Sequence, residues 1–232
     1  MLETIFGDKT MLYVPAKVAV AGLGNVGKTT LCRAIMGEDT TAERVETAGL
    51  QYHNWSFEGG SVIFFDFGGQ EMWDTILRRT IQRLSGLLTA KLILMVFDVS
   101  TKKTFKETVY DLNRWIDYFE EAGRKSNFAR PVLFVGNKID CENPERIEKG
   151  GIDVPIRELR TPLMDIMSRI ASPNQTHTLR LLHPSHDPRE RFEKNVVWVS
   201  ALYYNRNEDY RQRMERLRQE IIAAAKQPLK SK

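Results

Sequence analysis

The sequence predicts an α/β fold, and three observations lead to this prediction. Short apolar segments typical of buried strands alternate with longer segments whose apolar residues repeat every three or four positions, as on one face of a helix. Residues 22–29 read GLGNVGKT, a glycine-rich loop between a strand-like and a helix-like segment. The 232 residues, 42% hydrophobic and 28% charged, have the composition of a globular protein with one large domain.

Charge and cysteine content exclude several function classes. The chain has 34 basic and 30 acidic residues, and the resulting net charge of +4 is spread along the sequence, which does not indicate nucleic-acid binding. Two cysteines, Cys32 and Cys141, suit a reducing compartment better than a disulfide-linked fold. No signal peptide, bilayer-spanning run, N-terminal myristoylation site or C-terminal prenylation box is recognisable. We therefore expect a cytoplasmic protein without a stable membrane anchor.

The loop at 22–29 matches the pattern G-x-x-x-x-G-K-T of phosphate-binding loops. Residues 17–21 before it are the expected buried strand, and residues 30–36 open a helix whose positive end would face an anion. Lys28 is expected to reach the terminal phosphates, and Thr29 to bind Mg²⁺. The residues expected to contact the nucleotide here are Gly24, Asn25, Val26, Gly27, Lys28, Thr29 and Thr30. The alternative is a glycine-rich turn that binds no ligand.

A hairpin is predicted after the first helix. Residues 37–49 are polar and are expected to form a loop, and residues 50–57 and 61–66 then read as two strands around the turn signal Glu58-Gly59-Gly60. Because the second of these strands is apolar throughout, we expect it to lie in the middle of the sheet.

The end of this central strand has the residues of a second phosphate-site motif. Asp66 ends the strand and is followed by Phe67-Gly68-Gly69-Gln70. In phosphate-loop enzymes an aspartate at this position holds Mg²⁺. Asp66 is therefore expected to bind the ion through water, Gly69 to offer a backbone N–H near the γ-phosphate, and Gln70 to orient an attacking water. A plain Asp-Gly turn is the alternative.

The middle of the chain continues the alternation. Residues 72–90 have apolar side chains at helical spacing with arginines between them, and this face suits a partner surface and a core position equally. Residues 92–98 are another apolar strand. The apolar residues of the helix that follows it are expected to serve packing alone, and they are Phe105, Val109, Leu112, Ile116 and Phe119.

A base-recognition motif follows the strand predicted at 131–136. It reads Asn137-Lys138-Ile139-Asp140, in which Asp140 can accept hydrogen bonds from the N–H groups of guanine, Lys138 covers the base and Asn137 braces the phosphate loop. Adenine offers this carboxylate the wrong edge, so the motif favours GTP. A last strand at 196–199 leads to Ser200-Ala201-Leu202, whose backbone can contact the base. An amphipathic helix closes the chain.

Taken in order, these motifs resemble those of the Ras superfamily of small GTPases. The resemblance covers residues 22–202 and rests on GLGNVGKT, Thr47 in T-A-G-L, DFGGQ, NKID and SAL, and the form DFGGQE is most similar to the Arf, Rag and Roc branches. It implies an open, mostly parallel six-stranded sheet with helices on both faces. The implied domains are an N-terminal extension (1–16), a single G domain (17–226) and a short basic tail (227–232).

The resemblance also implies an activity and partners. The expected function is a molecular switch that hydrolyses GTP to GDP and phosphate with Mg²⁺, slowly without an activating protein, with Lys28, Thr47 and Gln70 as catalytic residues. Thr47 is also implied to bind Mg²⁺ and to sense the γ-phosphate. Effectors, an exchange factor and an activating protein are the implied partners. The alternative from another class is a GTP-binding scaffold that hydrolyses its nucleotide rarely or not at all.

The chain departs from the family pattern between its last two motifs. Asn137 and Ser200 lie 63 positions apart, which implies an insertion of about thirty residues. We assign it to residues 150–192, with a helix over 156–170 and loops at 172–175 and 183–189, and interpret it as a surface for a partner. His183 and His186 could bind a metal ion, but with no cysteine near them a solvated loop is favoured.

Arg44 is a further candidate catalytic residue. It lies three residues before Thr47, and in the α subunits of heterotrimeric G proteins an arginine at this offset acts on the transferring phosphate. Arg44 could in the same way neutralise charge in the transition state. A solvent-facing arginine in a charged loop is the alternative, and the sequence favours that alternative.

Overall fold

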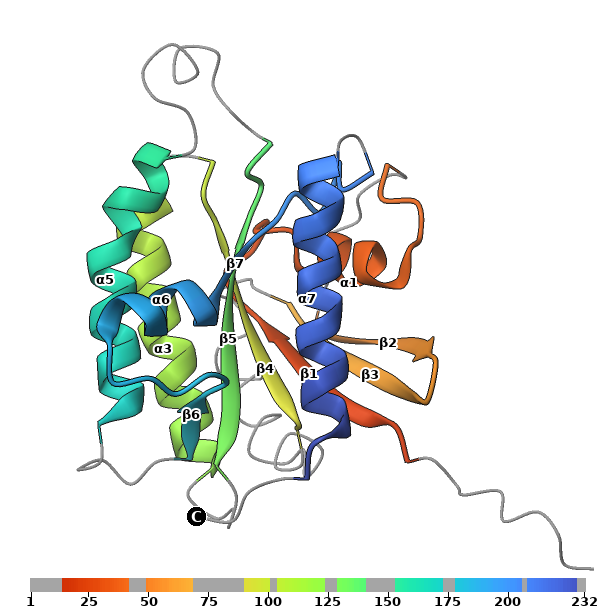
Figure 1. The fold of residues 1–232 in the computed structure, drawn as a ribbon, viewed down its shortest axis with the longest axis horizontal. Helices are drawn as coiled ribbons and strands as arrows, with labels where there is room; N and C mark the ends of the chain where they lie inside the picture. Colours follow the sequence, from red (N-terminus) through yellow and green to blue (C-terminus); the bar gives the residue numbers. More distant parts are fainter. Residues whose placement is uncertain are drawn as a thin grey trace, which may run out of the picture.

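The chain folds into one mixed β-sheet with helices on both faces (Figure 1). The computed structural model describes residues 14–41, 49–68, 90–100, 104–123, 129–140, 153–172, 178–205 and 208–228. The strands within these residues are β1 (Ala16–Ala21), β2 (Leu50–Phe57), β3 (Gly60–Phe67), β4 (Leu92–Asp98), β5 (Arg130–Asn137), β6 (Leu179–Leu181) and β7 (Val196–Trp198). The predicted α/β fold with a mostly parallel sheet is confirmed.

The strand order is β2-β3-β1-β4-β5, and both β6 and β7 pair with β5 at the far edge. Only β2 is antiparallel to its neighbour among the described strands. Every residue of β4 and β5 is buried, whereas the edge strand β2 exposes half of its residues. This difference explains why the central strands read as continuous apolar runs, since helices cover both of their faces.

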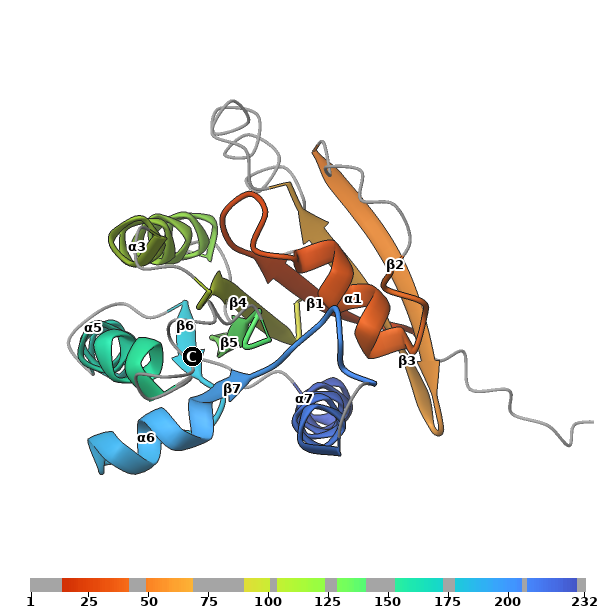
Figure 2. The same ribbon diagram turned by 90° about the horizontal axis from the view of Figure 1, so that it is seen from above.

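Two hydrophobic cores lie on opposite faces of the sheet. The described helices are α1 (Lys28–Met36), α3 (Thr104–Gly123), α5 (Asp153–Ala171), α6 (Pro188–Asn195) and α7 (Glu208–Lys226). Residues of α3, α5 and α6 build one core, and residues of α1 and α7 build the other. Figure 2 shows α3 and α5 together at one side of the molecule, away from α1 and α7. No helix in the described segments is long and apolar enough to cross a membrane.

The far edge of the sheet differs from the prediction of six strands, because two short strands share the position expected for one. β6 pairs with Arg130–Val132 at the start of β5, and β7 pairs with Phe134–Gly136 near its end. The sequence predicts no strand at residues 179–181. Three residues are too few to show a strand period, so only the contacts of β6 with its neighbours define it.

Helix α3 holds β6 in this position. Glu120 near the end of α3 accepts hydrogen bonds from the backbone N–H groups of Thr178 (3.3 Å) and Leu179 (3.2 Å), and the N–H of Arg130 donates to the carbonyl of Thr178 at 2.8 Å. The fully buried Asn195 closes the segment between β6 and β7, since its side chain bonds both the N–H and the carbonyl of His183 at 2.9 and 2.7 Å. The edge is therefore a fixed part of the sheet.

The helix predicted over 156–170 is present as α5, and it forms part of the core. Its face of Leu163, Ile166, Met167 and Ile170 is buried between α3 and the sheet. A parallel connection between β5 and β6 needs such a crossover helix. The predicted loop at 183–189 ends earlier than expected, because α6 begins at Pro188 with Asp187 as its N-cap. Much of the segment assigned to an insertion thus belongs to the sheet and its covering helix.

Candidate functional site

The loop between β1 and α1 has the backbone form that a phosphate-binding loop requires. Asn25 and Gly27 both have positive φ values, 61° and 86°, and Gly27 is the N-cap of α1. Gly22 has φ 149°, and a Cβ atom there would lie 2.1 Å from the carbonyl oxygen of Val96 on β4. The glycine at position 22 therefore lets the loop leave β1 in contact with the neighbouring strand.

Lys28 lies over this loop and is almost completely buried. Its Nζ donates to the carbonyl oxygens of Gly22 at 3.0 Å and Leu23 at 2.5 Å. Burial lowers the pKa of Lys28 from 10.5 to about 8, although the nearby carboxylates of Asp66 and Asp111 act in the opposite direction. The site thus contains a cation that two carbonyl groups stabilise incompletely, and an anion would stabilise it further.

This buried ammonium should make the stability of the nucleotide-free protein depend on pH. Between the folded pKa of about 8 and the unfolded value of 10.5, the unfolded state binds more protons, so the free energy of unfolding rises with pH. Burial raises the pKa of Cys32 above its usual 9.0. Above pH 9 this shift lowers the free energy of unfolding as the pH rises, which opposes the effect of Lys28. We expect a rise of about 1 kcal/mol between about pH 8 and 9.

Urea unfolding of nucleotide-free protein across this pH range is the measurement. Lys28→Met is the control, since it keeps most of the length of the side chain and removes the ionisable group. A variant that shows the same rise as the original chain would mean that Lys28 is not its source.

A second cluster lies where β3 ends beside α1. Asp66 is fully buried, and its Oδ2 accepts a hydrogen bond of 2.5 Å from the hydroxyl of Thr29. His53 on β2 approaches the same oxygen, with its Nε2 at 3.6 Å. Asp66 Oδ1 is buried and has no hydrogen-bond partner within the described part of the chain. A hydroxyl beside a carboxylate with a remaining acceptor oxygen matches the oxygen ligands that Mg²⁺ prefers, so these residues fit such an ion.

Asn137 joins the loop at 22–29 to the loop after β7. Its Nδ2 donates to the carbonyl oxygen of Val26 at 2.9 Å, and its Oδ1 accepts from the N–H of Ala201 at 3.0 Å. The side chain is 2% exposed, so both hydrogen bonds are shielded from water and hold their partners firmly. The segments at 22–29, 137–140 and 200–202 therefore meet around one side chain.

Residues at the end of β4 and just after β7 contact the rest of the NKID segment and hold it in place. Lys138 has a positive φ of 66°, and its Nζ lies 2.6 Å from Oδ2 of Asp98 at the end of β4. Asp98 also accepts hydrogen bonds from the N–H and the hydroxyl of Ser100. On the other side, the N–H of Ile139 donates to the carbonyl oxygen of Val199. Asp140 thus follows a backbone segment with fixed neighbours on both sides.

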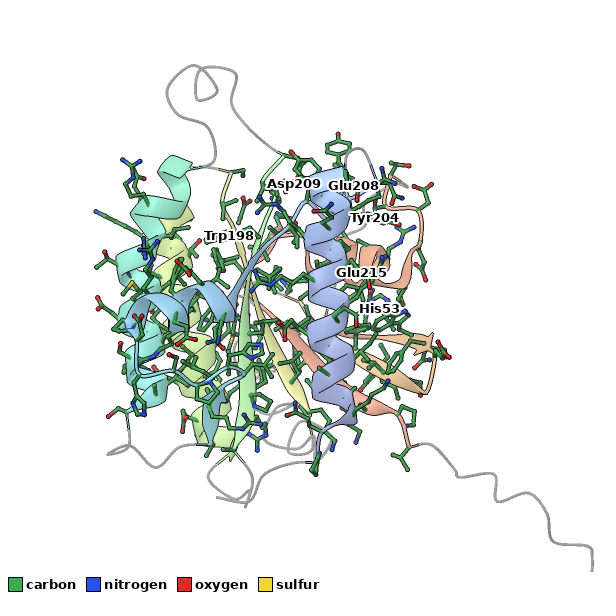
Figure 3. The ribbon with its side chains drawn as sticks, viewed as in Figure 1. His53, Trp198, Tyr204, Glu208, Asp209 and Glu215 are labelled. Carbon is green, nitrogen blue, oxygen red and sulfur yellow. The ribbon has the colours of Figure 1, made fainter. Side chains whose placement is uncertain are left out.

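Trp198, labelled in Figure 3, fixes the strand that delivers this segment. Its ring lies against the backbone of Gly136, where a Cβ atom would be 2.3 Å from the ring. The ring also makes edge contact with Phe97, at 5.8 Å between centroids. The glycine just before Asn137 is therefore required by the tryptophan that covers it.

Three side chains tie the end of α1 to the loop at 200–204 and to α7. The hydroxyl of Thr40 donates to the carbonyl oxygen of Leu202 at 2.9 Å, and the hydroxyl of Tyr204 lies 3.5 Å from the carbonyl oxygen of Glu38. Arg218 on α7 donates to the carbonyl oxygens at the end of α1, at 2.7 and 2.9 Å, and its guanidinium lies over the ring of Tyr204. Figure 3 labels Tyr204 near the start of α7.

Sequence reasoning missed several of these residues. No sequence pattern singled out His53, Asp98, Thr40 or Arg218, because their contacts depend on strand register and on how the helices pack. Asp98, which ends an apolar strand as Asp66 does, carried a signal that could have been used.

Several predicted site residues fall outside the described residues. They are Arg44, Thr47, Gly69 and Gln70. Cys141 and residues 72–89, which were not predicted as site residues, also lie outside the described residues. Of the two histidines considered as metal ligands, His183 lies with its Nε2 2.7 Å from a carboxylate oxygen of Glu220. The described residues contain no group of three or more histidine, cysteine, aspartate or glutamate side chains that could hold a metal ion.

Comparison with known proteins gives the family. Residues 17–140, more than half of the chain, match the family described as "Ras of Complex, Roc, domain of DAPkinase". The chain belongs to the Roc family of Ras-superfamily small GTPases. The predicted membership of the Ras superfamily is thereby confirmed, and with it membership of a family of GTP-binding proteins.

Curated relatives of this Roc domain include Rab and Arf-like proteins. The chain is 31% identical over 140 residues to Ras-related protein Rab-7B of Dictyostelium discoideum, which covers 59% of the chain and 64% of that protein. It is 26% identical over 145 residues to mouse Rab-12, covering 57% and 51%, and 27% identical over 125 residues to ADP-ribosylation factor-like protein 3 of Chlamydomonas reinhardtii, covering 54% and 63%. The match thus spans between half and two thirds of each relative.

Solved structures share the fold of the Roc domain. The small GTPase Arl6 BBS3 of Trypanosoma brucei, solved with the nucleotide analogue GppNp, has a TM-score of 0.57 at 16% identity and covers 93% of this chain and 100% of its own. The elongation factor SelB of Methanococcus maripaludis has a TM-score of 0.56 at 13% identity, covering 91% of this chain and 34% of its own. At these identities the likeness concerns the fold alone.

Proposed function

We propose that this chain binds GTP with Mg²⁺, hydrolyses it to GDP and phosphate, and signals to partner proteins as a molecular switch. The observation that carries the proposal is the pair of Asn137 hydrogen bonds, to Val26 and from Ala201. They join a loop suited to phosphates to two segments suited to a guanine base. Membership of a family of GTP-binding proteins supports the same interpretation.

The phosphate end of the proposed site combines three groups. The loop amides at 24–30 and the start of α1 would bind the phosphates, since helix N-termini favour anions. Lys28 would exchange its carbonyl partners for phosphate oxygens, which relieves the cost of its burial. Thr29, Thr47 and, through water, Asp66 would hold Mg²⁺. The bound ion would neutralise charge on the phosphate oxygens during transfer.

The base end of the proposed site accounts for a preference for guanine. Asp140 would accept from the ring N–H and the amino group of guanine, while the backbone at Ser200, Ala201 and Leu202 would contact its carbonyl oxygen. Lys138, which Asp98 holds at 2.6 Å, would cover the base. A base without those N–H groups would leave Asp140 unpaired in a shielded site, which costs more than a lost contact.

Hydrolysis and signalling are proposed for residues 44–47 and 69–70. Gln70 would orient the attacking water, and Gly69 and Thr47 would contact the γ-phosphate. Because these contacts exist only with GTP, the two segments would relax once phosphate leaves, and a partner protein could read the difference.

The proposal is tested with purified protein in two steps. GTP and ATP compete against fluorescent GDP in the presence of Mg²⁺, and equal affinities for the two would overturn the guanine assignment. The protein is then incubated with GTP and its bound nucleotide identified. GDP is the expected result, whereas persistent GTP would support a GTP-binding scaffold with little or no turnover.

Arg44→Ala should slow single-turnover hydrolysis of GTP by more than about tenfold, if Arg44 neutralises charge on the transferring phosphate. The affinity for GTP should stay nearly constant, because that charge develops only in the transition state. Glu43→Ala in the same segment is the control. An unchanged rate in Arg44→Ala would leave Arg44 as a surface residue.

A further inference from the structure

His53 on β2 and Asp66 on the neighbouring strand β3 have side chains that approach each other. Nε2 of His53 and Oδ1 of Asp66 are both buried, and neither has a hydrogen-bond partner within the described residues. The His53 side chain is 16% exposed and that of Asp66 is fully buried, with 3.6 Å between Nε2 and Asp66 Oδ2. Two buried polar atoms without partners in so small a space need an explanation, because burying them has a cost, and an ion that the pair serves would supply one.

The register of the β2–β3 pair explains this arrangement. Gln51 lies opposite Asp66, and His53 lies opposite Phe64, so His53 is a diagonal neighbour of Asp66 on one face of the sheet. That face packs against α1, the helix that supplies Thr29. His53 is therefore directed at the carboxylate from the strand side, and Thr29 from the helix side.

Thr29 and His53 approach the same oxygen of the Asp66 carboxylate and leave the other oxygen open. Oδ2 of Asp66 already accepts from the hydroxyl of Thr29 at 2.5 Å and has capacity for one more donor. A neutral imidazole with its hydrogen on Nε2 is such a donor, and a small rotation would shorten 3.6 Å to hydrogen-bond length. With Oδ2 bound by two donors, Oδ1 is left as the oxygen that can accept from a metal-bound water.

We propose that His53 is a positioning residue for the metal site: it donates from Nε2 to Oδ2 of Asp66 and keeps Oδ1 directed at the ion's water shell. The inference rests on the proposed function, since it assumes that Asp66 serves Mg²⁺. Partners that orient a direct metal ligand commonly change metal affinity by roughly 10- to 100-fold, and because Asp66 acts through water the lower end of this range is expected. His53 acts through Asp66 and touches neither metal nor nucleotide.

The test measures metal affinity through nucleotide release. Protein loaded with fluorescent GDP is titrated with Mg²⁺, and the concentration that half-maximally slows GDP release is determined. His53→Leu removes the donor and should raise this concentration by about tenfold. His53→Gln carries an amide nitrogen near the position of Nε2 and should restore most of the affinity. Asn54→Leu, on the opposite face of the same strand, should have no effect.

The outcomes separate this inference from the proposed function. If the unmodified chain binds no guanine nucleotide, or releases GDP at a rate independent of Mg²⁺, the proposed function fails and the inference with it. If release depends on Mg²⁺ but His53→Leu needs no more Mg²⁺ than the unmodified chain, only the inference is overturned. A higher Mg²⁺ affinity in His53→Leu would also overturn it, because the imidazole would then compete with the metal.

Two further measurements guard against a merely structural effect. The thermal unfolding of His53→Leu in chelator should stay close to that of the unmodified chain, since Nε2 of His53 has no hydrogen bond within the described residues that the substitution could remove. If His53→Leu does not fold, His53→Asn replaces it, because its shorter side chain does not reach Asp66, and the same loss of metal affinity is expected. Failure of His53→Gln to recover affinity would count against donation from Nε2.

Discussion

Replacing Asp140 with asparagine should lower the affinity for GDP by roughly 100-fold or more and raise the affinity for xanthosine diphosphate. The carboxylate can accept from both N–H groups of guanine, whereas an asparagine side chain offers one acceptor and one donor. Xanthine carries a carbonyl oxygen where guanine carries an amino group, so the amide donor of the introduced side chain would find a partner there. Displacement of fluorescent GDP by each nucleotide measures the change.

Asp117→Asn provides the matched control for this substitution. Asp117 is an exposed residue of α3 that pairs with Arg169 at 2.9 Å, so its replacement makes the same change of charge away from the site. Its GDP affinity should equal that of the unmodified chain. If Asp140→Asn kept its GDP affinity, the base would be recognised by other residues.

Gly22→Ala should lower the free energy of unfolding by about 3 kcal/mol. The added Cβ would lie 2.1 Å from the carbonyl oxygen of Val96, a backbone atom in the middle of the sheet that cannot rotate away. The φ value of 149° adds conformational strain for any residue other than glycine. Urea unfolding of nucleotide-free protein measures the loss without any contribution from ligand binding.

Gly37→Ala separates the two causes. Gly37 also has a positive φ, 80°, but a Cβ atom there would meet nothing within 4 Å. This variant should therefore lose only about 1 kcal/mol, the cost of the backbone conformation. Equal losses at both positions would mean that the contact with β4 is not the reason for glycine at position 22.

The sequence was informative where a residue type has one physical reason to be present. The runs at 92–98 and 131–136 were predicted as strands, because a short run that is apolar throughout is typical of a strand covered on both faces. The loop at 22–29 and the segment at 137–140 were recognisable because their glycines and charged residues occur at fixed spacing. Asn137 then meets Val26 and Ala201 across 111 and 64 positions of sequence.

The sequence was less informative where position depends on register or packing. His53 alternates with its neighbours like any residue of an edge strand, and only its pairing with β3 brings it to Asp66. The three residues of β6 were too few to show a period. The start of α6 was a different case, since Asp187 before Pro188 is a typical helix beginning that could have been recognised.

The edge of the sheet where β6 and β7 both pair with β5 has a consequence for regulation. β7 follows α6 directly and leads into Ser200, and its partner β5 ends at Asn137. A molecule that bound α6 and changed the affinity of the proposed site for its base would act through these two strands. By thermodynamic reciprocity, the nucleotide would change the affinity for that molecule by the same factor. The long segment between residues 140 and 200 would thus be a second input to the proposed switch, separate from residues 44–47 and 69–70.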